Sequence, residues 1–231
     1  NGKSGAVFSW FQTISRAYSL GGPMCHHYKS VRNPPAHLAD EFSVRSNLYD
    51  VQLPLAGFYP LHQVPIVRLD DQGEREMIAA QWGLLPGWWN PSGKSTSPQA
   101  FQRKTFNARS ESVHEKPTYR SAFKTRRCLL PAVEFFEKGH YFHFASIAPS
   151  RSPALGAVAE EGEIIESCTL LTTEPNELVQ SVGHHRMPVL LTDEQHYGLW
   201  LNPDIVERPA VEELFRPYPA AEMSCYEAVK S

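Results

Sequence analysis

The sequence predicts a single α+β domain in which a curved, largely antiparallel β-sheet is flanked by short helices. Short segments of alternating polar and apolar residues follow one another across turns, which is the pattern of β-hairpins. Helical periodicity is confined to brief stretches, and the strand–helix–strand units that build a parallel sheet are scarce. With 231 residues, of which 42% are hydrophobic, the chain is long enough for one domain with its own core.

Residues 1–23 are expected to form an N-terminal extension in front of a domain that comprises residues 24–231. The extension does not begin with methionine and is interpreted as a leader or as a remnant of expression or processing. It lacks the apolar run with a basic flank that is typical of a secretory signal. Apolar residues near helical spacing between Val7 and Tyr18 indicate a short amphipathic helix, and a Gly-Gly-Pro break ends it.

The first half of the domain is expected to contain a helix, a hairpin and a second helix. Residues 34–44 start with two prolines and carry apolar residues on one helical face. Val64–Leu69 alternates like a strand and forms a hairpin with Glu76–Leu85 across an Asp-Asp-Gln-Gly turn. Residues 90–100 are expected to be a polar loop, and Asn107–Glu115 a helix that stops before a proline.

The second half is expected to begin with two further hairpins. Cys128–Glu137 pairs with His140–Ile147 across a Lys-Gly turn, and Ala154–Ala159 pairs with Glu163–Thr173 across a Glu-Glu-Gly turn. A helix over Asn176–Val182 and a strand over Met187–Leu191 are expected next, followed by a helix over Thr192–Trp200. Thr192 and Gln195 indicate a capping box at the start of that helix. The last expected elements are a short helix over Val211–Phe215 and a strand over Met223–Val229.

Charge and cysteine content restrict the function only loosely. A net charge of -3 does not indicate a nucleic-acid-binding protein, so a DNA site would have to be a local basic patch. By itself the candidate patch is better explained as a solvated helical face; its members are Arg103, Lys104, Arg109, Lys116, Arg120, Lys124, Arg126 and Arg127. The four cysteines lack zinc-ligand or disulfide spacing, which favours a reducing compartment, and Cys128 and Cys168 are expected in the core.

The first motif that can carry chemistry is Met24-Cys25. Removal of an initiator methionine before a small residue would leave Cys25 as the first residue, with an α-amine and a β-thiol on adjacent carbons. A 1,2-aminothiol attacks an aldehyde twice, because the amine forms an imine and the thiol then closes a five-membered thiazolidine. The amine has a reference pKa of about 7.7–8.0, so a good fraction is neutral near pH 7. Taken alone, Cys25 is better explained as an ordinary buried cysteine.

Asn107 and Glu137 belong to two further motifs. Asn107 opens the segment Asn-Ala-Arg-Ser-Glu, where by itself it is interpreted as a helix cap; in a site, its amide would hold a nucleophile while Arg109 meets a phosphate. Glu137 ends the strand that follows Arg-Arg-Cys. Its carboxylate either faces solvent or points into a pocket walled by aromatic rings, which would raise its proton affinity for acid–base catalysis.

A pair of histidines, His184 and His185, precedes Arg186-Met187-Pro188. Adjacent histidines indicate metal binding or acid–base chemistry. Because no further His, Cys or Asp cluster has ligand spacing, acid–base chemistry is favoured and no metal is expected. The less specific alternative is a surface pair at the end of a helix.

Together these motifs resemble the SOS response-associated peptidase (SRAP) family. The family pattern consists of an initiator Met-Cys, a Trp-Gly-x-x-Pro-x-Trp turn, Asn-Ala-Arg-x-Glu, Arg-Arg-Cys before a strand that ends in Glu, and His-x-Arg-Met-Pro. All five occur in this order between residues 24 and 188, which is far more specific than any single motif. The resemblance covers most of the chain after residue 23 and implies a compact α+β domain with a barrel-like curved sheet.

The resemblance implies roles for ten residues. Four correspond to the catalytic residues of the family: the nucleophile Cys25 that links to DNA, Asn107 that orients it, Glu137 that shuttles protons, and His184 as a second acid–base group. Six correspond to DNA-contacting positions: Arg109 and Arg186 at phosphates, Trp88 and Trp89 against bases, Pro60 beside the bound strand and Thr172 near the lesion.

Several segments depart from the family pattern. His26-His27 replaces Gly-Arg after the cysteine, Gly57-Phe58-Tyr59-Pro60 replaces Asn-x-Ala-Pro, and Lys138 follows Glu137 where tryptophan is usual. These differences are expected to change DNA affinity and substrate shape more than the core chemistry. They are consistent with a divergent member of phage or plasmid origin.

The implied function is covalent capture of abasic sites in single-stranded DNA through a thiazolidine with Cys25, with autoproteolytic exposure of that cysteine, in the SOS response to DNA damage. This would be an enzyme of the hydrolase or lyase class: a cytoplasmic monomer that joins the nucleoid on DNA and needs no membrane, metal or small-molecule cofactor. If residues 1–23 stay attached, Cys25 carries an amide and cannot form the ring. The alternatives are a cysteine-type peptidase acting in trans, with His184 as base, and a non-catalytic single-stranded DNA-binding protein.

Overall fold

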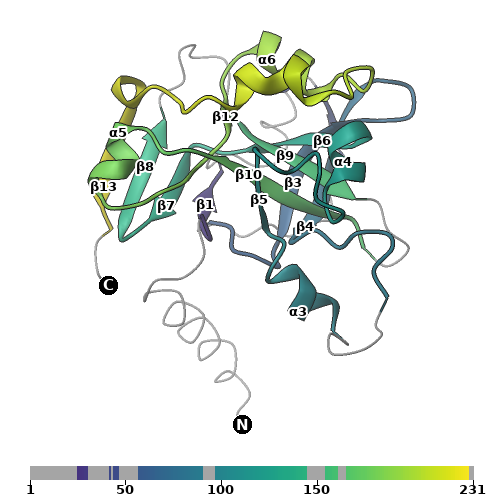
Figure 1. Ribbon diagram of the computed structural model, residues 1–231, viewed down its shortest axis with the longest axis horizontal. Helices are drawn as coiled ribbons and strands as arrows, with labels where there is room; N and C mark the ends of the chain where they lie inside the picture. The colour runs from purple at the N-terminus through teal and green to yellow at the C-terminus, as the bar shows by residue number, and fades with distance from the viewer. Residues whose placement is uncertain are drawn as a thin grey trace.

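The computed structural model describes residues 25–30, 42, 44–46, 57–90, 97–144, 154–160 and 165–228. Within these ranges two β-sheets form the body of the protein, and short helices cover their edges and faces (Figure 1). The α+β prediction is therefore confirmed. The helix expected in the extension and most of the one expected over residues 34–44 lie outside the described residues.

Nine strands of the described residues form the larger sheet: β2 (Arg45–Ser46), β3 (Gln63–Leu69), β4 (Arg75–Trp82), β5 (Asn107–Arg109), β6 (Arg127–Pro131), β9 (Ala154–Glu160), β10 (Ser167–Thr173), β11 (Met187–Pro188) and β12 (Leu190–Leu191). Five of them pair in a circuit that runs from β10 through β4, β3, β6 and β9 back to β10. Two of the strand pairings in this circuit are short, since β4 and β10 share only two residue pairs and β3 and β6 share one. The sheet is thus strongly curved without being a regular barrel.

Two of the predicted hairpins supply four strands of this sheet, β3 with β4 and β9 with β10. β3 and β4 pair antiparallel over their whole length, from Gln63–Gln81 to Leu69–Arg75. The turn between them is fixed by Asp70, whose Oδ1 accepts hydrogen bonds from the backbone N–H groups of Gln72 and Glu74. The pairing of β9 with β10 is also confirmed.

The smaller sheet has four antiparallel strands in the order β1 (Tyr28–Lys29), β7 (Glu134–Glu137), β8 (His140–Phe144) and β13 (Met223–Glu227). The single strand expected over Cys128–Glu137 is wrong, because the chain leaves the larger sheet after β6 and enters the smaller one as β7. Val133 marks the change: its N–H donates to the carbonyl of Lys29, and its own carbonyl accepts from Phe144. The break brings Glu137 to the junction of the sheets.

In the part of the chain that the structure describes, the helices are α3 (Pro98–Gln102), α4 (Arg120–Thr125), α5 (Glu177–Ser181), α6 (Glu194–Leu201) and the 3₁₀ segments η1 (Arg208–Phe215) and η2 (Ala220–Glu222). The loop expected over residues 90–100 therefore includes the start of α3. The capping box at Thr192 is wrong, since Asp193 accepts the hydrogen bond from His196 and caps α6. The strand expected over Met187–Leu191 is divided into β11 and β12, which pair with different neighbours.

The helix expected over Asn107–Glu115 is wrong. Residues Asn107–Arg109 form β5, which pairs in parallel with Leu170–Thr172 of β10, and turns follow it. Ala108 is buried in this ladder. The backbone hydrogen bonds to β10 replace those that a helix would have made, so a non-local partner overrides the local helix signal.

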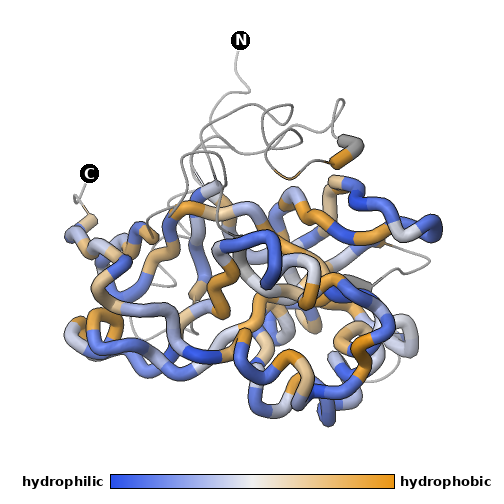
Figure 2. The backbone as a smooth tube through the Cα atoms, turned by 90° about the horizontal axis from the view of Figure 1, so that it is seen from above, coloured by the Kyte–Doolittle hydropathy of each residue, from blue (hydrophilic) through white to orange (hydrophobic). Residues whose placement is uncertain are grey.

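Two apolar clusters form the core. One lies between the two sheets and includes Tyr28, Trp82, Phe135 and Phe142; the other lies under α6 and η1, around Leu129 and Trp200. The prediction that Cys128 and Cys168 are core residues is confirmed, since neither has exposed surface. In Figure 2 short hydrophobic stretches alternate with hydrophilic ones along the described chain. No helix in these ranges is long and apolar enough to cross a membrane.

Arg127 of the Arg-Arg-Cys motif is a structural cation. Its guanidinium is buried and donates to the carbonyls of Trp200 and Asn202 at the end of α6 and to that of Phe123 at 3.2 Å. Burial lowers the pKa of Arg127 to about 10. The side chain satisfies carbonyls that a helix C-terminus leaves without partners.

Replacement of Arg127 by methionine is expected to lower the free energy of unfolding by ~2–4 kcal/mol, because it leaves these buried carbonyls unpaired. Urea denaturation measures the change. Arg126→Met is the matched control, since Arg126 lies at the end of α4 and donates to Ser121 in an exposed pair. Equal effects of the two substitutions would contradict the role of Arg127.

Candidate functional site

Cys25 lies just before β1, at the junction of the two sheets, and only 1% of it is exposed. Its backbone N–H donates to Glu137 Oε1. Its φ of 35° lies in the left-handed region, which is costly for a residue with a Cβ. The main chain of Cys25 is therefore held in a strained conformation beside a buried carboxyl group.

Asn107 fixes the other side of the same main chain. Its Nδ2 donates to the Cys25 carbonyl at 3.1 Å. The side chain is positioned by β5, whose own place is set by the ladder with β10. The asparagine motif thus acts from a strand, where its amide reaches a residue 82 positions earlier in the chain.

Glu137 and His184 form a buried pair behind Cys25. Glu137 Oε2 lies 3.1 Å from His184 Nε2, and the side chains are 4% and 9% exposed. His184 Nδ1 lies 2.8 Å from the carbonyl of Arg186. Because a carbonyl only accepts, Nδ1 of the neutral ring carries the hydrogen, and Nε2 is left as an acceptor toward Glu137.

Burial shifts both groups toward their neutral forms. It raises the pKa of Glu137 to about 8, although the hydrogen bond from Cys25 and the charge of Lys138 act in the opposite direction. Burial also lowers the pKa of His184. Both shifts favour a neutral carboxyl group that faces a neutral imidazole across the 3.1 Å contact. Burial and then the charge of Glu137 raise the pKa of the Cys25 thiol well above its usual value.

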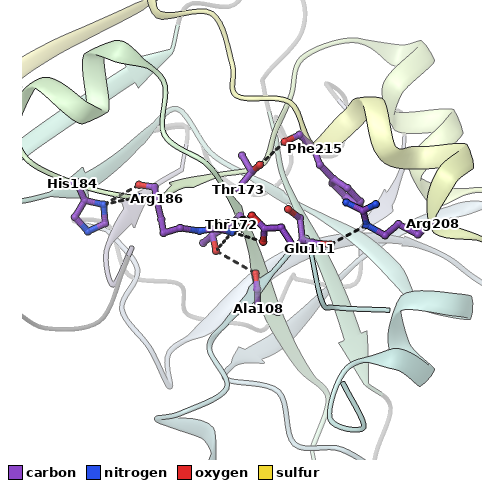
Figure 3. A network of polar contacts seen from close by, with 9 residues as sticks. Ala108, Glu111, Thr172, Thr173, His184, Arg186, Arg208 and Phe215 are labelled. Carbon is purple, nitrogen blue, oxygen red and sulfur yellow. Dashed lines mark hydrogen bonds and ion pairs between the residues drawn. The ribbon is translucent and has the colours of Figure 1, made fainter. Parts of the chain in front are cut away.

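Arg186 lies beside His184 of this pair, and Thr172 contacts the Arg186 side chain (Figure 3). The Arg186 guanidinium binds both carboxylate oxygens of Glu111, with Nη2 2.8 Å from Oε2, and also donates to the Thr172 carbonyl at 2.6 Å. The Thr172 hydroxyl is buried and donates to the carbonyl of Ala108 at 3.3 Å. Arg186 is thus bound by protein groups in this structure.

Arg109 is the partner of Thr172 in the β5–β10 ladder, and its side chain is exposed. Thr172 and the two arginines expected at phosphates therefore occupy one region beside the residues expected to be catalytic. The basic patch does not form a helical face, because its members are spread over the end of α3, β5, the following turns and α4. Arg127, the last of them, is buried.

The two indoles and Pro60 belong to loops. Trp88 is 59% exposed, and its ring packs edge-on against Phe101, with centroids 6.1 Å apart. Trp89 is half-buried against the same ring. Pro60 is half-buried in the turn before β3, where the next residue donates to the carbonyl of Trp82 at 2.7 Å.

Two segments that depart from the family pattern pack on each other. The His27 ring stacks on Tyr59 with centroids 4.3 Å apart, and it also touches Phe136 and Tyr141. Gly57 has a φ of 131°, and a Cβ there would lie 2.3 Å from His27 Nε2. The loop that contains Gly57 therefore leaves room for the His27 ring. Where the family pattern has an arginine after the cysteine, this chain has His27 in a group of stacked aromatic rings.

Sequence reasoning missed the contributions of Glu111 and His27. Glu111 is the last residue of the Asn-Ala-Arg-Ser-Glu motif, but nothing local says that it binds Arg186, which lies 75 positions later. The available signal was an acidic residue at a fixed place in the same motif as Arg109, an arginine expected at a phosphate. Among the described residues no group of three or more His, Cys, Asp or Glu side chains could hold a metal ion.

Comparisons with known proteins agree on the family and the fold. Residues 24–231 match the family model described as SOS response associated peptidase (SRAP). The abasic site processing protein YoqW of Bacillus subtilis (strain 168) is 29% identical over 200 residues, which cover 77% of this chain and 83% of that protein. The abasic site processing protein YoaM of the same organism is 32% identical over 69% of this chain and 71% of its own.

Solved structures extend the likeness to the whole fold. A protein from Bacteroides thetaiotaomicron superposes with a TM-score of 0.73 at 21% identity, covering 88% of this chain and 91% of that one. A protein from Bordetella bronchiseptica superposes with a TM-score of 0.69 at 25% identity, covering 90% of this chain and all of that one.

Proposed function

Because this chain belongs to the SOS response associated peptidase (SRAP) family, we propose that it captures abasic sites in single-stranded DNA, with Cys25 as its reacting N-terminal residue. Relatives that share this family carry the name abasic site processing protein. The observation that carries the proposal is that Glu137 and Asn107 both bind the main chain of Cys25, while His184 contacts Glu137. The nitrogen at that point is the atom that would attack the sugar.

The reaction needs only groups that Cys25 and the DNA supply. An abasic site is partly an open-chain aldehyde. The neutral amine adds to C1′, and the resulting carbinolamine loses water to give an imine. The thiol then adds across the C=N bond: sulfur bonds to carbon, and the thiol proton ends on nitrogen. Ring closure removes the imine that would otherwise act as an electron sink for β-elimination, so the strand stays intact.

Glu137 and His184 supply proton transfer for these steps. A carboxyl group with a pKa of about 8 is protonated near pH 7 and can protonate the hydroxyl that leaves as water. His184 Nε2 accepts a hydrogen bond from Glu137 and can return the proton. Asn107 holds the Cys25 carbonyl, which orients the amine and the thiol together. The roles given to Glu137, His184 and Asn107 each rest on a contact in the structure, and none of them requires Cys25 to be an exposed thiolate.

Exposure of the amine requires cleavage of the Met24–Cys25 peptide bond. In hydrolysis, water adds to the Met24 carbonyl carbon, and the Cys25 nitrogen leaves with an added proton. Glu137 Oε1 is hydrogen-bonded to that nitrogen, so the carboxyl group lies close enough to deliver a proton once Oε1 carries it. Cleavage also relieves the left-handed φ of Cys25, because φ is no longer fixed by a preceding residue.

Processing can be read from the intact mass of the purified chain. We expect a species that begins at Cys25 to accumulate during incubation near neutral pH, and to accumulate more slowly for Glu137→Gln. Mass spectrometry of samples taken over time measures both. A mass that stays constant for the unsubstituted chain would contradict self-cleavage, and the exposed cysteine would then require another protease.

DNA binding is assigned to the region beside the reacting group. Arg109 and Arg186 would position phosphates, and exposed Trp88 and half-buried Trp89 would stack on bases at about 1–3 kcal/mol per full contact. Pro60 would border the strand, and Thr172 would lie near the lesion.

The structure favours this function over the two alternatives. A peptidase acting in trans needs a Cys25 thiolate, whereas burial and Glu137 raise the pKa of this thiol. A simple single-strand binder has no use for a buried Glu137–His184 pair, whose desolvation costs free energy. The test is a denaturing gel of abasic single-stranded DNA with protein trimmed to start at Cys25. A heat-stable adduct supports capture, and its absence contradicts it.

A further inference from the structure

Arg186 is restrained at two points that serve different parts of the site. Its guanidinium is bound by Glu111 and Thr172, and its side chain is only 12% exposed. Its carbonyl accepts the hydrogen bond from His184 Nδ1 at 2.8 Å. The residue therefore links the expected phosphate contact to the imidazole that faces Glu137 (Figure 3).

The Glu111 carboxylate occupies the position in which Arg186 would bind a phosphate. Both carboxylate oxygens meet the two terminal nitrogens, the geometry with which a guanidinium also binds two phosphate oxygens. Burial alone would raise the pKa of Glu111, but the hydrogen bond and charge of Arg186 outweigh it and keep the pKa low. The carboxylate is therefore ionised whenever the protein meets DNA.

We propose that Glu111 is a positioning residue that stands in for a DNA phosphate on Arg186 until the strand binds. In the free protein it fixes Arg186, and through the Arg186 carbonyl it fixes His184 toward Glu137. A phosphate must displace this carboxylate, so Glu111 lowers the affinity for DNA in general. The inference rests on the proposed function, because it assigns Arg186 to a phosphate.

The surroundings allow the exchange. The Glu111 side chain is 44% exposed, so solvent and a DNA strand can reach it. It also borders a cavity of about 590 Å³, which is lined by Arg208 and Arg216 together with Glu174, Glu212 and Glu213. A displaced carboxylate would thus have space to move into. Glu212 lines the same cavity and is paired with Arg208 at 2.6 Å. It can therefore serve as a control for Glu111, because it is an acidic residue that binds a different arginine.

The experiment measures the affinity of the full chain for an intact single-stranded oligonucleotide, by fluorescence anisotropy over about 50–200 mM salt. Glu111→Gln is expected to bind about fivefold tighter at the lowest salt. The slope of log K against log salt should steepen by about 0.7, the value for one added phosphate contact on a single strand. Glu212→Gln removes the same charge from the same cavity, and its slope should change by less than half as much.

A double substitution tests whether Glu111 acts through Arg186. In an Arg186→Gln background, Glu111→Gln should no longer change the slope. Glu111→Asp retains the charge, so its slope should stay near that of the unsubstituted chain. If Glu111→Gln does not fold, Glu111→Asp takes its place in the comparison and should bind DNA slightly more tightly than the unsubstituted chain.

Equal slopes for Glu111→Gln and Glu212→Gln, or an effect that persists without Arg186, would overturn the inference. The trimmed, unsubstituted protein separates this failure from failure of the proposed function. If it forms the heat-stable adduct while the slopes coincide, only the role of Glu111 is refuted. If it neither binds nor crosslinks DNA, both proposals fail.

Discussion

Replacement of Cys25 by alanine is expected to reduce the heat-stable adduct with an abasic oligonucleotide to background. The variant, trimmed to start at residue 25, keeps the α-amine but has no thiol, so an imine forms and no ring can close. An imine is reversible and is an electron sink, so β-elimination should cut the strand. Denaturing gels should show lost adduct and new cleavage product, and borohydride should trap the imine.

Another free thiol supplies the control for this experiment. Cys225 lies on β13 and is half-buried and unpaired, so Cys225→Ala removes a more accessible thiol than Cys25 without touching the site. Its adduct yield should equal that of the unsubstituted protein. A Cys25→Ala protein that still forms the heat-stable adduct would refute the assignment of the reacting group.

Glu137→Gln is expected to slow adduct formation by about 10²–10⁴-fold, the usual contribution of a positioned acid–base group. The substitution keeps the shape of the pair. The amide oxygen can accept from Cys25, and the amide nitrogen can donate to His184 Nε2, so the buried contacts survive while proton transfer does not. Time courses at saturating DNA measure the rate. A rate within a fewfold of the unsubstituted protein would remove Glu137 from the mechanism.

The pH dependence of stability offers a second readout for Glu137. Its folded pKa of about 8 lies above the ordinary value of 4.5, so between these values the folded state holds a proton that the unfolded state has released. Stability should therefore fall as pH rises from about 4.5 to 8 and then level off. Glu137→Gln has no group to ionise there and should show a weaker decline in thermal unfolding temperature.

The rate of adduct formation should also depend on pH. The amine should set the acidic limb of the pH–rate profile, and Glu137 should set the alkaline limb. Below the pKa of the amine, protonation removes the nucleophile, and above the pKa of Glu137 the acid is lost. Since the two groups touch, the limbs belong to the pair and not to either residue alone. The decline on the alkaline side should disappear in Glu137→Gln.

The grouping of the candidate catalytic residues could be predicted because their motifs occur in order along the chain. Each motif alone was ambiguous: Asn107 fitted a helix cap, and His184 fitted a surface pair. The structure brings both to Cys25 and Glu137, over sequence separations of 82 residues for Asn107–Cys25 and 112 for Glu137–Cys25. Their exact partners could not be derived, because a local pattern does not encode which distant backbone group a side chain will meet.

The sequence by itself determined the elements whose partners lie close along the chain. Alternation and turn chemistry sufficed for the β3–β4 hairpin, because its strands are adjacent along the chain. The turn between them is held by hydrogen bonds within a few residues of Asp70. Only the tertiary structure decided that Asn107 stands in a strand, that the chain changes sheets at Val133, and that Glu111 binds Arg186. In each of these cases a backbone or side-chain group is satisfied by a partner far along the chain, and that pairing outweighs local propensities worth less than about 1 kcal/mol per residue.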